Sequence, residues 1–129
     1  PFIPDGWEVE KHKKGGFFKW NPPKIQLFSH FTQRDGGTIA GGDLDRELLG
    51  KPVLNANVLD YLLAHPDLIP VGWSGQCVSF WGTIYQVYTS KRHYLVRFLY
   101  QKDDKTWASG HFTFEATLGS DHPAALRVV

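Results

Sequence analysis

Residues 54–84 constrain the fold more than any other part of the chain. Asn55 is a preferred helix N-cap, and apolar residues follow it at helical spacing. Pro66 cannot continue a helix and disfavours helical geometry in the residue before it, so we expect a helix over residues 55–65, about three turns long. A helix this short is marginal in water unless it packs against other structure. The sequence therefore predicts a sheet beside it.

Three runs rich in β-branched and aromatic residues supply that sheet. They cover residues 78–88, 94–101 and 106–116 and are joined by short polar loops, which predicts antiparallel hairpins and a C-terminal three-stranded meander. A further strand is predicted over residues 24–32, where apolar and polar side chains alternate. We therefore expect an α+β fold with an antiparallel sheet of about four to five strands.

A second, shorter helix is predicted over residues 43–49. Asp43 can accept hydrogen bonds from the first-turn amides, Leu44 and Leu48 lie one turn apart on one face, and Gly50 follows as a stop.

With 129 residues, the chain fits a single domain. We divide it into an irregular N-terminal segment over 1–23, an α+β core over 24–118 and a C-terminal tail over 119–129. One cysteine, Cys77, excludes an internal disulfide and suits a reducing compartment, so we expect a cytoplasmic protein. No apolar run approaches the about 18 residues of a membrane span, so no membrane partner is expected.

Alternation along the three C-terminal strands defines two predicted sheet faces. The first is strongly apolar and is the predicted seat of the 55–65 helix. It comprises Val78, Phe80, Ile84, Tyr94, Val96, Phe98, Tyr100, Phe112 and Phe114. The second combines aromatic rings with an arginine and histidines. Its proposed ligand or interface residues are Trp81, Thr83, Tyr85, Arg97 and Trp107.

This mixed face gives the leading functional hypothesis, a non-enzymatic binding or interaction module. Aromatics make up 15% of the chain, more large rings than one small core normally takes. Exposed rings could stack a small planar ligand, contact another protein or pair with a second copy in a homodimer. The alternative is that the N-terminal segment or another subunit covers this face, which would make the rings core residues.

A small enzyme is the second hypothesis. His93, His111 and Glu115 lie on the same predicted face as Arg97 and are weak candidates for acid–base catalysis. This hypothesis requires their side chains to converge on a common cavity. The six histidines are scattered along the sequence, and neither a metal site nor a cofactor is predicted.

A basic and aromatic segment near the N-terminus gives the third hypothesis, weak nucleic-acid binding. Its candidate residues are Lys11, Lys13, Lys14, Phe18, Lys19 and Trp20. Lysines and rings in alternation suit phosphates and stacked bases. Glu8 and Glu10 weaken the local field, and the formal net charge is only +1, so nucleic acid is disfavoured as a partner relative to a solvated loop.

One block resembles small uncharacterised proteins predicted from uncultured bacterial genomes. It comprises LNANVLDYLL at 54–63, Pro66, LIP at 68–70, Trp73 and FWGTIY at 80–85. The likeness extends over residues 24–126 and leaves the basic segment outside. This resemblance implies a shared scaffold and transfers no catalytic residue, because the family has no assigned activity.

Overall fold

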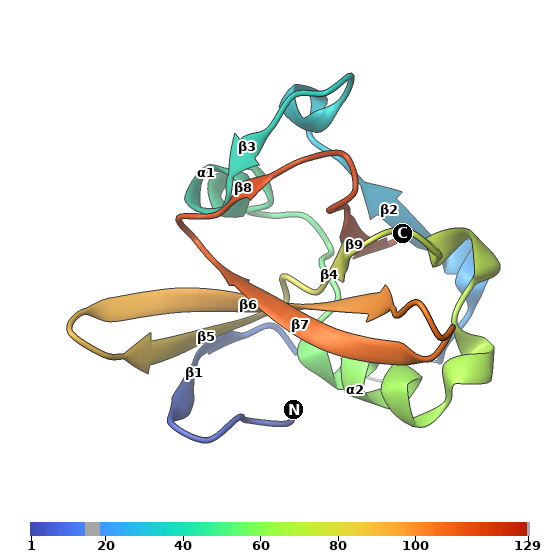
Figure 1. Ribbon diagram of the computed structural model, residues 1–129, viewed down its shortest axis with the longest axis horizontal. Helices are drawn as coiled ribbons and strands as arrows, with labels where there is room; N and C mark the ends of the chain where they lie inside the picture. The colour runs from blue at the N-terminus through green and yellow to red at the C-terminus, as the bar shows by residue number, and fades with distance from the viewer. Residues whose placement is uncertain (15–18, 129) are drawn as a thin grey trace.

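The computed structural model describes residues 1–14 and 19–128 (Figure 1). The α-helices in this part of the chain are α1 (Gly41–Glu47) and α2 (Ala56–Ala64). Short 3-10 helices cover Pro22–Lys24, Phe31–Gln33, Pro66–Leu68 and Val71–Trp73. The strands are β1 (Trp7–His12), β2 (Ile25–Phe28), β3 (Ile39–Ala40), β4 (Val78–Ser79), β5 (Thr83–Tyr88), β6 (Arg92–Gln101), β7 (Trp107–Thr113), β8 (Thr117–Leu118) and β9 (Ala124–Arg127). The predicted α+β class is confirmed.

The long strand β6 is the centre of a curled sheet (Figure 1). Along one edge it pairs antiparallel with β5 and then with β4, and along the other edge with β7. Strand β1 extends the sheet beyond β5, while β9 and β2 extend it beyond β4. Seven strands in the described chain therefore form one sheet, with β3 and β8 in a second, two-stranded sheet. The predicted count of four to five was too low.

The undercount comes from segments that we expected to be irregular. β1 lies inside the 1–23 segment and β9 inside the 119–129 tail, and each pairs with a strand far away in sequence. Their apolar runs are short, so their extended conformation depends on partners that local alternation does not identify.

The predicted strand over 78–88 is interrupted, and this changes the face on which the residues before Gly82 lie. β4 and β5 are separate strands, and the three residues between them shift the register against β6. As a result Val78 and Phe80 pack with Leu99, whereas Trp81 and Ile84 pack on the opposite face. Strict alternation across the break had placed Val78 with Ile84.

Each helix covers one face of the sheet, and α2 lies on the face opposite to the one predicted for the 55–65 helix. Leu44 in the middle of α1 and Leu48 at its C-cap pack against the apolar face, which includes Ile84, Val96 and Phe112. Helix α2 packs on the other face, where its apolar side chains join Val78, Phe80 and Leu99 in a second core cluster. Apart from Trp81, which packs on the apolar face, the mixed face is therefore the face that α2 covers.

Helix α1 begins two residues earlier than predicted, so Asp43 lies in its first turn and is not the N-cap. The N-cap, Ala40, has no capping side chain. Instead, Gly41 N–H donates to the Ala116 carbonyl at 2.9 Å and Gly42 N–H to the Phe114 carbonyl at 2.9 Å. Tertiary backbone acceptors thus satisfy the helix start and fix its position.

Candidate functional site

The proposed ligand residues of the mixed face lie mostly in the interior. Trp81, Thr83, Tyr85 and Arg97 are between 0% and 5% exposed, and the partly buried Trp107 packs on the α2 core. The prediction of an exposed aromatic face is therefore wrong, and the alternative of a covered face is confirmed. The cover over Tyr85 and Arg97 comes from α2 and from the N-terminal residues Phe2 and Trp7, whereas Trp81 packs with Phe112 and Phe114 on the face that α1 covers.

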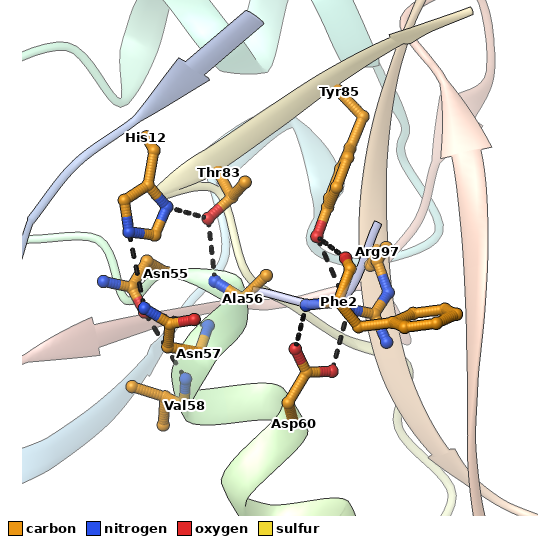
Figure 2. Close-up of polar contacts among 10 residues, drawn as sticks. All are labelled: Phe2, His12, Asn55, Ala56, Asn57, Val58, Asp60, Thr83, Tyr85 and Arg97. Carbon is orange, nitrogen blue, oxygen red and sulfur yellow. Dashed lines mark hydrogen bonds and ion pairs between the residues drawn. The ribbon is translucent and has the colours of Figure 1, made fainter. Parts of the chain in front are cut away.

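Arg97 is held in a buried polar network with the N-terminal segment (Figure 2). Its Nη1 donates to Asp60 Oδ1 at 2.9 Å and lies 3.4 Å from the Tyr85 hydroxyl oxygen. Phe2 N–H donates to Asp60 Oδ2 at 2.8 Å, and the Tyr85 hydroxyl donates to the Phe2 carbonyl at 2.8 Å. Burial raises the pKa of Tyr85, which keeps its hydroxyl a donor. These groups satisfy one another and tie residue 2 to the sheet.

The candidate acid–base residues do not converge on a common cavity. His93 Nδ1 lies 3.9 Å from Oε1 of Glu115, which follows β7 in the turn beyond the β6–β7 pairing. His111 sits further along β7, opposite Arg97 in the register, and its ring meets the edge of Trp7 at 4.9 Å. None of the three candidates lines either cavity described below. This arrangement does not meet the condition set for the enzyme hypothesis.

Most of the basic segment borders a cleft. Lys13, Lys14, Lys19 and Trp20 line it, whereas Phe18 lies outside the described residues. Lys11 instead lines a smaller cavity of about 200 Å³ between β1 and α1, together with Glu10, Asp45, Ile84, Tyr94 and Phe114.

The cleft has a volume of about 840 Å³. Its walls come from the end of β1, the segment before α2, the first turns of α2 and the end of β9. The lining residues are His12, Lys13, Lys14, Lys19, Trp20, Pro52, Val53, Leu54, Asn55, Asn57, Val58, Tyr61 and Arg127. Four of these side chains are cationic, and no carboxylate lines the cleft among the residues that the structure describes. A concave surface of one charge sign attracts anions.

The N-terminus of α2 forms one wall and is tied to β1. The Asn55 side-chain oxygen accepts from the N–H groups of Asn57 and Val58 at 3.0 and 3.4 Å, which confirms the predicted N-cap. The Asn55 amide donates to the Lys13 carbonyl at 3.0 Å. Since Thr83 Oγ1 accepts from Ala56 N–H at 2.9 Å, the first helix amides already have partners. An anion in the cleft would therefore be bound by side chains.

His12 lines the cleft and also contacts Thr83, which accepts from the first N–H group of α2 (Figure 2). Its Nδ1 lies 2.8 Å from Thr83 Oγ1, and its Nε2 lies 3.5 Å from the Asn57 amide nitrogen. Because Thr83 Oγ1 accepts from a backbone N–H, its own proton is available for His12 Nδ1, which favours a neutral ring. Burial lowers the pKa of His12, and the N-terminal amino group and Lys14 lower it further.

Two aromatic rings border the cationic side chains. The Trp20 indole N–H donates to the Leu68 carbonyl at 3.0 Å, and its ring meets Trp73 edge-on at 6.0 Å. Tyr61 is 45% exposed and lies on the second turn of α2. The cleft therefore combines cations with a fixed indole and an accessible phenol ring.

Sequence reasoning found the lysines and Trp20 but missed His12, Tyr61 and Arg127 as cleft residues. Arg127 reaches the cleft because β9 pairs with β2, and His12 because β1 pairs with β5. No local motif marks either pairing. Asn55 was recognised only as a helix cap, because its second role depends on Lys13 in a distant segment.

Residues 1–14 and 19–128 hold neither a metal-ligand cluster nor a membrane-spanning helix. Among these residues no group of three or more His, Cys, Asp or Glu side chains is placed to hold a metal ion. No helix among them is long and apolar enough to cross a membrane. The family indicated by the 54–85 block stays a prediction, because no family model, curated protein or solved structure matches this chain.

Proposed function

We propose that this protein is a non-enzymatic binding module whose cleft holds a phosphate-bearing ligand with a planar base, either a nucleotide or a short single strand of nucleic acid. One observation carries the proposal: cationic side chains and two aromatic rings share a single cleft that no carboxylate of the described chain lines. Cations suit phosphates, and rings suit bases. The cleft volume of about 840 Å³ lies within the range of small-molecule sites.

The cleft gives the basic segment a specific geometry that a solvated loop lacks. Lys14 and Lys19 are exposed on one side, Arg127 lies at the end of β9, and Tyr61 projects from α2. The low net charge of +1 limits non-specific attraction of anions to the whole protein, so phosphate binding depends on the cationic side chains of the cleft.

Neutralising two cleft lysines tests the proposal. The double substitution Lys14→Gln/Lys19→Gln should weaken binding of a fluorescein-labelled oligothymidylate by at least about tenfold in low salt. It should also reduce the slope of log affinity against log salt concentration by about 1.4, since each phosphate contact to a single strand contributes about 0.7. Fluorescence anisotropy at several salt concentrations measures both quantities.

The matched control is Lys91→Gln/Lys102→Gln, which makes the same charge change away from the cleft. An equal loss of affinity in both variants, or no binding by the unaltered chain, would contradict the proposal. Thymidine monophosphate separates the two ligand sources. Equal affinity for the mononucleotide and the oligonucleotide indicates a nucleotide site, whereas affinity that rises with length indicates a single-strand site.

Oligonucleotide affinity should also rise as pH falls from about 7.5 to about 5.5. Burial, the N-terminal amino group and Lys14 lower the pKa of His12 in the free protein, so its ring is neutral near pH 7. A bound phosphodiester favours the protonated ring and raises that pKa, so a proton is taken up on binding. His12→Gln should abolish the added pH dependence, as measured by anisotropy at each pH. A steep rise that persists in His12→Gln would exclude this role.

A further inference from the structure

The cations of the cleft lie toward both ends of helix α2. Lys13 Nζ donates to the Lys51 carbonyl at 2.7 Å, in the segment before the helix. Lys19 precedes Trp20, whose indole N–H donates to the Leu68 carbonyl in the turn after the helix. The nine residues of α2 span about 13 Å, at a rise of about 1.5 Å per residue. The positive charge of the cleft is therefore distributed along the helix and is not gathered at one point.

This distribution fits several phosphates better than one. The single phosphate of a nucleoside monophosphate can contact the cations at only one end of α2. Successive phosphates along one strand are about 3.4 Å apart, so about four of them cover the length of the helix. No carboxylate of residues 1–14 and 19–128 lines the cleft and would repel them. The charges therefore favour a strand over a free nucleotide.

Tyr61 offers a stacking surface between the two groups of cations. It lies on the second turn of α2, lines the cleft and is 45% exposed. The His65 ring packs against it with ring centroids 4.6 Å apart, which restricts the phenol ring before a ligand arrives. Long helical side chains lean toward the N-terminus of their helix, so this ring is directed toward the turn of Asn57 and Val58, which also line the cleft.

A ring in this position discriminates between kinds of nucleic acid. Stacking on an aromatic side chain tolerates every base, because every base has a π-face. In a duplex, however, each base face is already covered by the neighbouring base pairs. Tyr61 can therefore stack only on a base of an unpaired strand.

We propose that the cleft binds about four consecutive nucleotides of a single strand, laid along α2 with one base stacked on Tyr61. This binding mode rests on the proposed function, because it requires a cleft that takes both phosphate and base. It specifies the ligand as an unpaired strand, as opposed to a free nucleotide or a duplex. His65 is a positioning residue, since it acts through the Tyr61 ring.

A length series tests the strand. Unlabelled thymidylates of one to eight nucleotides compete with a fluorescein-labelled octamer for the full chain, and fluorescence anisotropy measures the displacement. Affinity should rise at least about tenfold from the monophosphate to the tetramer, and less than about threefold from the tetramer to the octamer once the number of binding registers is corrected for. A duplex of about 16 base pairs should bind at least about tenfold more weakly than its thymidylate strand alone.

The outcomes of the series separate this binding mode from the proposed function. Equal affinity for the monophosphate and the tetramer, or for the duplex and its single strand, would overturn the single-strand mode and leave phosphate binding in the cleft intact. If no thymidylate of any length binds, both the proposed function and this mode are wrong.

An abasic strand isolates the contribution of Tyr61. Tyr61→Leu should weaken binding of the thymidylate octamer by at least about fivefold, and should leave binding of an abasic octamer with the same phosphates within about twofold. His65→Ala should show the same selectivity with a smaller loss. Tyr88→Leu is the matched control, because Tyr88 is 72% exposed and does not line the cleft. Equal losses for the two octamers in Tyr61→Leu, or an equal loss in Tyr88→Leu, would exclude Tyr61 as the stacking residue.

Discussion

Replacing Asp60 with alanine is expected to lower the free energy of unfolding by about 3 kcal/mol. The Arg97 side chain is 6% exposed and that of Asp60 28% exposed, and their atoms Nη1 and Oδ1 lie 2.9 Å apart. Removing the carboxylate leaves the guanidinium buried without its counter-charge, and Phe2 N–H also loses its acceptor. Urea unfolding followed by tryptophan fluorescence measures the change.

Two comparisons isolate the buried charge. Asp67→Ala removes an exposed carboxylate from the Pro66–Leu68 turn and should change stability by less than about 0.5 kcal/mol. The double substitution Asp60→Leu/Arg97→Met removes both charges and should recover much of the loss, because an apolar pair needs no counter-charge. If Asp60→Ala proves no more destabilising than Asp67→Ala, the ion pair does not stabilise the fold.

This prediction depends on where Arg97 lies, and the sequence alone placed it wrongly. Alternation correctly grouped Thr83, Tyr85 and Arg97 on one face of the sheet. It could not say which helix covers that face, because the N-cap and the proline stop fix only the length of α2. An arginine among aromatic rings has the same sequence pattern whether it faces solvent or a carboxylate on a covering helix.

For the candidate site, the sequence indicated the residue types but not how the chain brings them together. The basic segment could be recognised as a group of cations and rings, since these residues are neighbours in sequence. Its geometry comes from contacts between segments far apart: Asn55 bonds to the Lys13 carbonyl, and the Trp20 indole bonds to the Leu68 carbonyl. Local patterns predict elements with strong caps and stops, but they do not predict which loops meet.

Gly82 makes two of these long-range contacts, at the point where α2, the sheet and the cleft meet. Gly82 N–H donates to the Leu54 carbonyl at 2.8 Å, and the Gly82 carbonyl accepts from Lys13 N–H at 2.6 Å. A Cβ atom on Gly82 would lie 2.7 Å from Asn55 N and 2.8 Å from the Leu54 carbonyl carbon. Both are backbone atoms, so no side-chain rotation can relieve the overlap.

Gly82→Ala is therefore expected to destabilise the fold by about 3 kcal/mol or more and to weaken ligand binding in the cleft, because the N-terminus of α2 must move away from the sheet. Gly72→Ala is the matched control. A Cβ atom there has no neighbour within 4 Å, so stability and affinity should stay nearly unchanged. Urea unfolding and oligothymidylate anisotropy of the two variants measure both effects. If Gly82→Ala matched Gly72→Ala in stability, the close packing of α2 on the sheet at Gly82 would be disproved.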